Sequence, residues 1–179
     1  MKTVDREYVE SHKEEIIEAI QKGSIFIYPT DTIYGLGCNA LLDDAVMRLR
    51  ELKHREEKPF SVIAPSKNWI IKNCEVKSED LDKYLPGPYT LFVRRDENAV
   101  SRFVNQNDDT LGVRIPTHWF TEIIAEAGVP FVTTSVNLSG EKHMEDMNSA
   151  SKEILDQVDY VIYEGEKRGE PSKKINLVS

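Results

Sequence analysis

Near the start of this chain, the residues best suited to chemistry form the polar stretch 30–32 (Thr-Asp-Thr), which follows the apolar run 25–27. Threonine hydroxyls and a carboxylate can bond nearby main chain or a ligand, and Gly35 and Gly37 would let backbone approach a bound group closely. A well-formed turn between a strand and a helix explains the same residues equally well. The stretch is therefore either a binding wall or a structural turn.

A basic segment follows the next predicted helix and contains Lys53, Arg55 and Lys58. Lysine as a point charge and arginine as a planar fork are the side chains that a triphosphate needs. Cations also complement the negative C-terminal end of a helix, and Glu51 lies four residues before Arg55, so a solvated helix tail is the alternative.

Two later strands end in residues that could bind a polar or anionic ligand. The stretch 133–140 (Thr-Thr-Ser-Val-Asn-Leu-Ser-Gly) follows an apolar strand, where open α/β sheets place ligands, although a hydrogen-bonded turn would use the same residues. Arg114 lies within an apolar strand and must face water, a partner or a ligand such as a carboxylate, because a buried unpaired guanidinium is costly. An ordinary edge-strand arginine is the alternative. The glycine-rich phosphate loop and the dinucleotide fingerprint are both absent from the sequence.

Composition limits the class of protein. The chain has 179 residues, of which 40% are hydrophobic and 30% charged, so we expect one globular domain over residues 1–179. A formal net charge of −8 argues against a protein that coats nucleic acid or an anionic membrane, while leaving room for a local basic pocket. The N-terminus carries no apolar leader and no run is long enough to span a bilayer, which favours a cytoplasmic protein.

The residue types that hold metals or disulfides show no meaningful spacing. Cys38 and Cys74 are far apart, so neither a disulfide framework nor a zinc site is predicted. The four histidines are better explained as surface residues, and we expect no metal held by the protein; they are His12, His54, His118 and His143.

Apolar periodicity predicts interleaved helices and strands. The fold class expected is α/β with one twisted sheet of mixed direction, because some strands lack an intervening helix. Helices are expected over 5–22, from Asp43 or Asp44 to Arg55, over 65–71 and 78–85, from Pro116 to Gly128 with Trp119, Ile123 and Ile124 buried, and over 150–155. Strands are expected over 24–28, 60–64, 89–95, 111–115, 130–134, 159–163 and 174–178. Residues 96–109 are expected as a loop, with a turn of helix near Val100 to Val104 as the alternative.

Six short motifs, in order from residue 24 to residue 172, resemble the YrdC-type L-threonylcarbamoyl-AMP synthase family. Each motif is weak alone, whereas six in the same order make a specific signal. They are Pro29-Thr30-Asp31-Thr32-Ile33-Tyr34-Gly35-Leu36, Lys53-x-Arg55, Leu85-Pro86-Gly87-Pro88-Tyr89-Thr90, Gly112-Val113-Arg114-Ile115-Pro116, Thr134-Ser135-Val136-Asn137-Leu138-Ser139-Gly140 and Pro171-Ser172.

The resemblance implies a YrdC-like sheet flanked by helices, with a concave, positively charged cavity. It implies a nucleotidyltransferase that makes threonylcarbamoyl-AMP and pyrophosphate from ATP, L-threonine and bicarbonate or CO2, for t6A modification of tRNA. The step needs alignment and charge stabilisation more than a protein nucleophile, with Mg²⁺ carried mainly by the phosphates. Lys53 and Arg55 would be catalytic; Lys53, Arg55, Lys58, Thr110, Ser135 and Asn137 would bind ATP; Thr30, Thr32, Tyr34, Arg114, Thr133 and Ser172 would bind threonine.

The resemblance also implies a hand-off to the tRNA threonylcarbamoyl transferase, with weak or indirect tRNA binding. Several residues depart from the family pattern: Glu56 and Glu57 add negative charge, His143 replaces a small hydroxyl residue, and Lys173 follows Ser172. The sequence ends at Ser179, before the arginine-containing tail that relatives place on the nucleotide. Asp31 is expected to bond the backbone of its own turn. The alternative function is a non-catalytic RNA- or ribosome-associated binding protein on the same fold.

Overall fold

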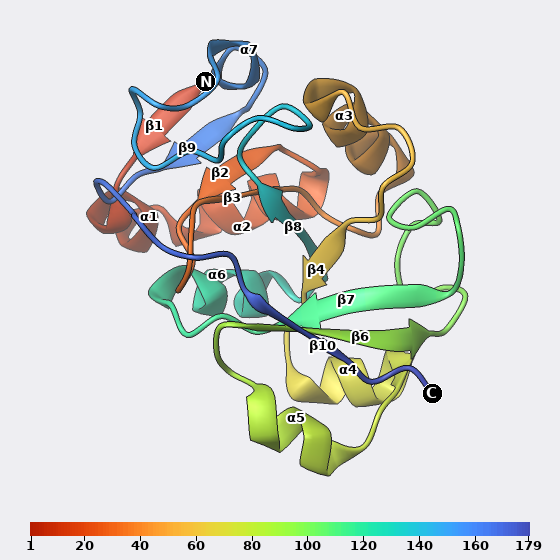
Figure 1. The fold of residues 1–179 in the computed structure, drawn as a ribbon. Helices are drawn as coiled ribbons and strands as arrows, with labels where there is room; N and C mark the ends of the chain where they lie inside the picture. Colours follow the sequence, from red (N-terminus) through yellow and green to blue (C-terminus); the bar gives the residue numbers. More distant parts are fainter.

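The computed structural model describes residues 1–179 as a twisted sheet with helices on both faces (Figure 1). The helices are α1 (Arg6–Ser11), α2 (Lys13–Lys22), α3 (Asp43–Lys53), α4 (Lys67–Asn73), α5 (Ser78–Tyr84), α6 (Trp119–Ala127) and α7 (Lys152–Leu155). The strands are β1 (Lys2–Val4), β2 (Phe26–Tyr28), β3 (Gly35–Gly37), β4 (Ser61–Ile63), β5 (Cys74–Glu75), β6 (Tyr89–Arg95), β7 (Thr110–Arg114), β8 (Phe131–Ser135), β9 (Tyr160–Ile162) and β10 (Lys173–Asn176).

The ten strands form one sheet in the order β1-β9-β2-β3-β8-β4-β7-β6-β10, and β5 pairs with β6. The sheet contains both parallel pairs (β1 with β9, β4 with β7, β6 with β10) and antiparallel pairs (β2 with β3, β3 with β8, β6 with β7). The predicted α/β fold with a mixed sheet is confirmed.

Alternation along the central strands divides the core into two layers, because successive strand side chains point to opposite faces. Phe26 and Tyr28 of β2 pack with Ile16 of α2 and Phe120 of α6 on one face. Ile25 and Ile27 belong to the cluster on the other face, which α3, α4, α5 and α7 cover. Each face therefore excludes water, and no helix has both the length and the apolar character needed to cross a bilayer.

The predicted elements are mostly present, with instructive errors at turns. The helix expected over 5–22 is two helices that meet at His12. Gly35–Gly37, expected as part of a turn into a helix, is strand β3, so the 30–32 stretch lies in a turn between two strands. Strands β1 and β5 were not predicted. Residues 96–109 form a loop, as expected, and the alternative turn of helix near Val100 to Val104 is absent.

The start of two helices also differs from the prediction. Leu42, not Asp43 or Asp44, is the N-terminal cap of α3. The helix predicted from Pro116 begins at Trp119, because the His118 side chain caps it by accepting the Phe120 amide. Phe120 is consequently the fully buried aromatic residue, whereas Trp119 is only partly buried.

Candidate functional site

A cavity of about 530 Å³ lies beside the turn between β2 and β3, against β7, β8 and the residues that precede β10. It collects residues from motifs that are far apart in the sequence. Every residue singled out above for ATP or threonine lines it except Lys53: Thr30, Thr32, Tyr34, Arg55, Lys58, Thr110, Arg114, Thr133, Ser135, Asn137 and Ser172.

Lys53 lies behind the cavity wall and is 1% exposed. Its Nζ donates to Thr134 Oγ1 (3.1 Å), the Ser135 carbonyl oxygen (2.5 Å) and Asn137 Oδ1 (3.1 Å). Burial and two neighbouring cations lower its pKa to about 7. The alternative of a solvated helix tail is therefore wrong for Lys53, which supports the loop that follows β8 from behind.

Arg55 reaches the cavity along its wall. Its Nη1 donates to Thr134 Oγ1 (3.2 Å) and its Nη2 to the Pro59 carbonyl oxygen (2.6 Å). Burial, and to a smaller extent the positive charge of the nearby Arg50, lowers the pKa of Arg55 to about 10. Arg50 is buried and donates Nη1 to the carbonyl oxygens of Arg55 (3.2 Å) and Lys58 (2.9 Å). Arg50 thus fixes the backbone that carries the cavity residues Arg55 and Lys58.

Arg114 is held by an acid on the turn between β2 and β3. Its Nη2 lies 2.5 Å from Asp31 Oδ1, and both side chains are nearly buried, at 6% and 11% exposed. Asp31 Oδ2 also accepts the Thr117 amide at 2.8 Å. The expectation that Asp31 bonds the backbone of its own turn is wrong, and so is the edge-strand reading of Arg114, because β7 lies between β4 and β6.

The Arg114 guanidinium retains binding capacity. Its Nε is buried without a hydrogen-bond partner, and its Nη1 contacts Thr32 Oγ1 at 3.4 Å. Burial lowers the pKa of Arg114, and the neighbouring Asp31 opposes that shift. Arg114 also lines the cavity, where its guanidinium has the charge and geometry to bind a carboxylate ligand.

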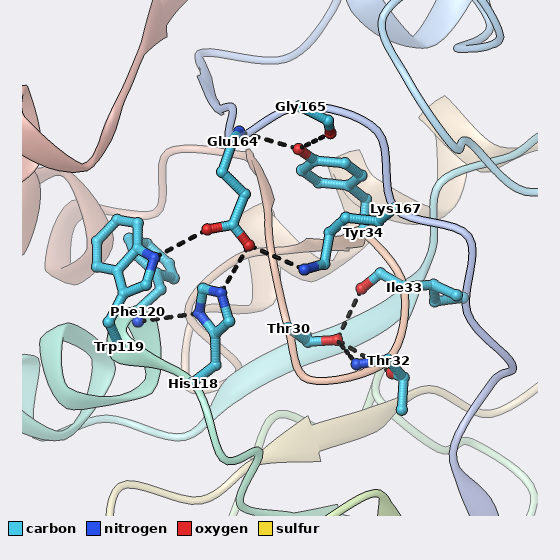
Figure 2. A network of polar contacts seen from close by, with 10 residues as sticks. All are labelled: Thr30, Thr32, Ile33, Tyr34, His118, Trp119, Phe120, Glu164, Gly165 and Lys167. Carbon is cyan, nitrogen blue, oxygen red and sulfur yellow. Dashed lines mark hydrogen bonds and ion pairs between the residues drawn. The ribbon is translucent and has the colours of Figure 1, made fainter.

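The turn between β2 and β3 is fixed by its own hydroxyl groups (Figure 2). Thr30 Oγ1 donates to the Ile33 carbonyl oxygen (2.7 Å) and accepts the Thr32 amide (3.1 Å). The Tyr34 hydroxyl donates to the Gly165 carbonyl oxygen (2.7 Å), and burial raises its pKa to about 12. Tyr34 is thus a neutral hydrogen-bonding residue at neutral pH.

Residues 164–172 form a strap that runs from the end of β9 across the front of the molecule to β10 (Figure 1). Ser172 Oγ lies 2.5 Å from Thr90 Oγ1, and the Lys173 amide donates to the Pro88 carbonyl oxygen at 2.8 Å. The two motifs around residues 88–90 and 171–172 therefore meet in space.

Cations predominate in the cavity lining, although the whole chain has a formal charge of −8. The charged lining residues are Arg55, Lys58, Arg114, Lys142 and Lys174 against Glu141 alone. Glu56 and Glu57 do not line the cavity. No group of three or more His, Cys, Asp or Glu residues is placed to hold a metal ion.

Sequence reasoning missed several residues of this site. Arg50 lies four residues after the inward-facing Val46, and this helical spacing could have placed it in the core. The sequence predicts His118 and His143 as surface residues, but the His118 side chain is 10% exposed and His143 lines the cavity with a buried, unpartnered Nε2. Local sequence carries no signal for either histidine.

The family model described as "Telomere recombination" and named for Sua5, YciO and YrdC matches residues 18–179. A putative threonylcarbamoyl-AMP synthase from Methanocaldococcus jannaschii is 36% identical over 178 residues, covering 94% of this chain and 83% of the relative. A threonylcarbamoyl-AMP synthase from Vibrio campbellii is 30% identical over 164 residues, covering 87% of this chain and 88% of the relative.

Solved structures share the fold. P. abyssi Sua5 complexed with L-threonine superimposes with a TM-score of 0.87 at 28% identity over 98% of this chain. The chain spans only 54% of the length of that Sua5 chain. Family model, relatives and fold agree, and the chain belongs to the Sua5/YciO/YrdC family.

Proposed function

We propose that this chain is an L-threonylcarbamoyl-AMP synthase, which uses ATP, L-threonine and bicarbonate or CO2, releases pyrophosphate, and serves the t6A modification of tRNA. The observation that carries the proposal is the single cavity into which the distant family motifs converge. Support comes from the relatives named threonylcarbamoyl-AMP synthase and from the Sua5 complex with L-threonine. None of these supports the alternative of a non-catalytic RNA-binding protein.

At the amino-acid end, Arg114, which lines the cavity beside Thr32, receives the threonine carboxylate. The small hydroxyl residues around it fit a small polar side chain, and a fixed guanidinium orients the substrate before reaction. The remaining residues proposed for this end are Thr30, Thr32, Tyr34, Thr133 and Ser172.

At the nucleotide end, Arg55 and Lys58 face the phosphates, with Thr110, Ser135 and Asn137 as polar contacts. A carbamate oxygen of the carboxylated threonine attacks the α-phosphorus, a new P–O bond forms, and the bond to pyrophosphate breaks. Cations placed in advance stabilise the charge that develops on the phosphoryl oxygens and the leaving group. Lys53 acts through the end of β8 and the loop that follows it, to which its three hydrogen bonds run.

Mg²⁺ would be carried mainly by the phosphates of the nucleotide. Glu141 is the one carboxylate in the lining, so the donor set does not fit an ion held by the protein, whereas a phosphate-borne ion needs few protein ligands. Both cysteines are free and buried, in keeping with a reaction in the reducing cytoplasm. The product then passes to the tRNA threonylcarbamoyl transferase.

Pyrophosphate release tests the proposal. The protein is incubated with ATP, Mg²⁺, labelled bicarbonate and L-threonine, and release is expected only when all are present. Release with L-serine but not L-threonine would refute the substrate assignment, and no release with either would refute the synthase. Arg55→Ala is expected to weaken ATP binding at least about tenfold, since a charged hydrogen-bonding group is lost.

Arg94→Ala is the matched control. Arg94 is paired with Asp109 at 2.7 Å, is 42% exposed and lies outside the cavity. Its loss is expected to leave ATP affinity unchanged. Equal ATP affinity of the Arg55→Ala protein and the unaltered protein, measured by calorimetry, would remove Arg55 from the nucleotide site.

A further inference from the structure

The strap begins at a cluster of polar side chains around Glu164 (Figure 2). Glu164 is its centre: Oε1 accepts from His118 Nε2 (2.7 Å) and Lys167 Nζ (2.9 Å), and Oε2 accepts from Trp119 Nε1 (3.0 Å). The Glu164 amide also donates to the Tyr34 hydroxyl at 3.0 Å. One residue thus ties the strap to the start of α6 and to the turn between β2 and β3.

The ionisation states in this cluster agree with its hydrogen bonds. Burial opposes ionisation of Glu164, but hydrogen bonds from Lys167, Trp119 and His118 outweigh it and lower the pKa of the carboxyl. His118 Nδ1 accepts the Phe120 amide, so its Nε2 carries the proton that is donated to Glu164. Both oxygen atoms of the Glu164 carboxylate therefore accept hydrogen bonds from neighbouring side chains.

Further along, the strap lies directly on Thr32. A Cβ atom at Gly169 would stand 2.2 Å from the Thr32 carbonyl oxygen and 3.0 Å from its carbonyl carbon, so only glycine permits this backbone contact. The Thr32 amide and hydroxyl are meanwhile held by Thr30 Oγ1, at 3.1 and 3.0 Å. Thr32 is consequently fixed from the turn on one side and from the strap on the other.

We propose that Glu164 and Gly169 are positioning residues for amino-acid binding: Glu164 fixes the strap, and Gly169 lets it press on Thr32 at the amino-acid end of the cavity. This rests on the proposed function, because that function puts threonine at Thr32 and Arg114. Neither residue lines the cavity, so both act through Thr32 and through the cavity residues Pro171 and Ser172 that end the strap.

Glu164→Ala is expected to raise the threonine Kd about tenfold, equivalent to about 1.4 kcal/mol, because its three donors lose their acceptor. ATP affinity, and kcat at saturating threonine, should stay within about twofold, since the nucleotide end keeps its contacts. Glu166→Ala is the matched control: Glu166 lies in the same strap but is 48% exposed and pairs only with Arg168.

Two further variants test the same proposal, one by a smaller change to the Glu164 cluster and one by a change elsewhere in the strap. Trp119→Phe removes one donor to Glu164 while preserving the ring packing, and should raise the threonine Kd less than Glu164→Ala does. Gly169→Ala must push the strap off Thr32, and should raise the threonine Kd at least as much. Threonine affinities equal to that of the unaltered protein in both Glu164→Ala and Gly169→Ala would overturn the proposal.

Hydrogen exchange separates this proposal from the proposed function. Amide exchange in residues 164–172 should accelerate in Glu164→Ala and not in Glu166→Ala, with or without substrates, because the strap loses its first anchor. Unchanged exchange would refute the anchoring role alone. Absence of threonine binding by the unaltered protein would instead refute the proposed function and, with it, the role in amino-acid binding.

Discussion

The buried ion pair between Asp31 and Arg114 supports a prediction whose size can be worked out. Asp31→Asn removes the negative charge but keeps the shape of the side chain. Asp31 accepts two hydrogen bonds, from Arg114 Nη2 at 2.5 Å and from the Thr117 amide at 2.8 Å, and an amide group can satisfy only one of them with its oxygen. Arg114, at 6% exposed, is then left with an uncompensated charge.

Breaking a buried pair by removing one partner costs about 3–5 kcal/mol. The amide oxygen of asparagine retains part of the interaction, so we expect Asp31→Asn to lower the free energy of unfolding by about 3 kcal/mol. In a chain of 179 residues this corresponds to a fall in Tm of about 6–12 °C. Urea unfolding measures it through the midpoint, provided that the slope is unchanged.

A double-mutant cycle tests whether the loss comes from the pair. Arg114→Met alone should also lower the free energy of unfolding, because it leaves Asp31 without its cation. The loss in the double variant should be smaller than the sum of the two single losses by about 1.5 kcal/mol or more. Asp109→Asn is the control: Asp109 pairs with Arg94 at 2.7 Å, but both side chains are exposed (57% and 42%), so the loss should stay under about 1 kcal/mol. Additive losses, or equal losses for Asp31 and Asp109, would refute the reasoning.

Three further predictions concern buried bases. ATP should raise the pKa of Lys53 from about 7, because its phosphates offset the charge of the neighbouring cations. ATP binding at pH 8 should therefore take up a proton in the unaltered protein and not in Lys53→Met. Calorimetry in buffers of different ionisation heat measures the difference. Burial lowers the pKa of His118 below 6.5, so as the pH falls the unfolded chain takes up a proton at this residue before the folded protein does. The free energy of unfolding should therefore fall as the pH drops below about 6.5, and less steeply in His118→Asn. Equal slopes of unfolding free energy against pH in the two proteins would contradict this. Arg50→Lys loses most of four hydrogen bonds to carbonyl groups, and should lower stability by about 2 kcal/mol and raise the KM for ATP; unchanged stability and KM would argue against its role in positioning Arg55.

Local sequence patterns predicted most helices and strands, but the prediction was wrong at the glycine-containing strand β3. Strand β6 occupies Tyr89–Arg95 as expected, because a β-rich run is bounded by proline and by a polar loop. Strand β3 was missed because Gly35 and Gly37 usually indicate a turn. A Cβ at Gly37 would stand 1.7 Å from the Val132 carbonyl oxygen, so this glycine serves a close approach between strands, which only the folded sheet reveals.

In the candidate site, too, some features could be predicted from the sequence and others could not. The resemblance assigned a set of residues to ATP or threonine, and all of that set but Lys53 line one cavity. The residues that hold them were not foreseen: Asp31 meets Arg114 across 83 residues, and His118 meets Glu164 across 46. Such contacts depend on how distant elements pack, and neither partner lies in a local pattern that names the other.

The pairing of β10 with β6 has a consequence for how the protein is made. Ser172 meets Thr90 across 82 residues, and the strap reaches the turn at Thr32 only when this late segment has been synthesised. A chain that leaves the ribosome N-terminus first can form the β2–β3 pair early, but one wall of the cavity is still missing. Completion of the cavity therefore waits for a contact of high sequence separation, a slow kind of event in folding. A nascent chain that stops short of residue 172 has no closed pocket in which to hold an amino acid.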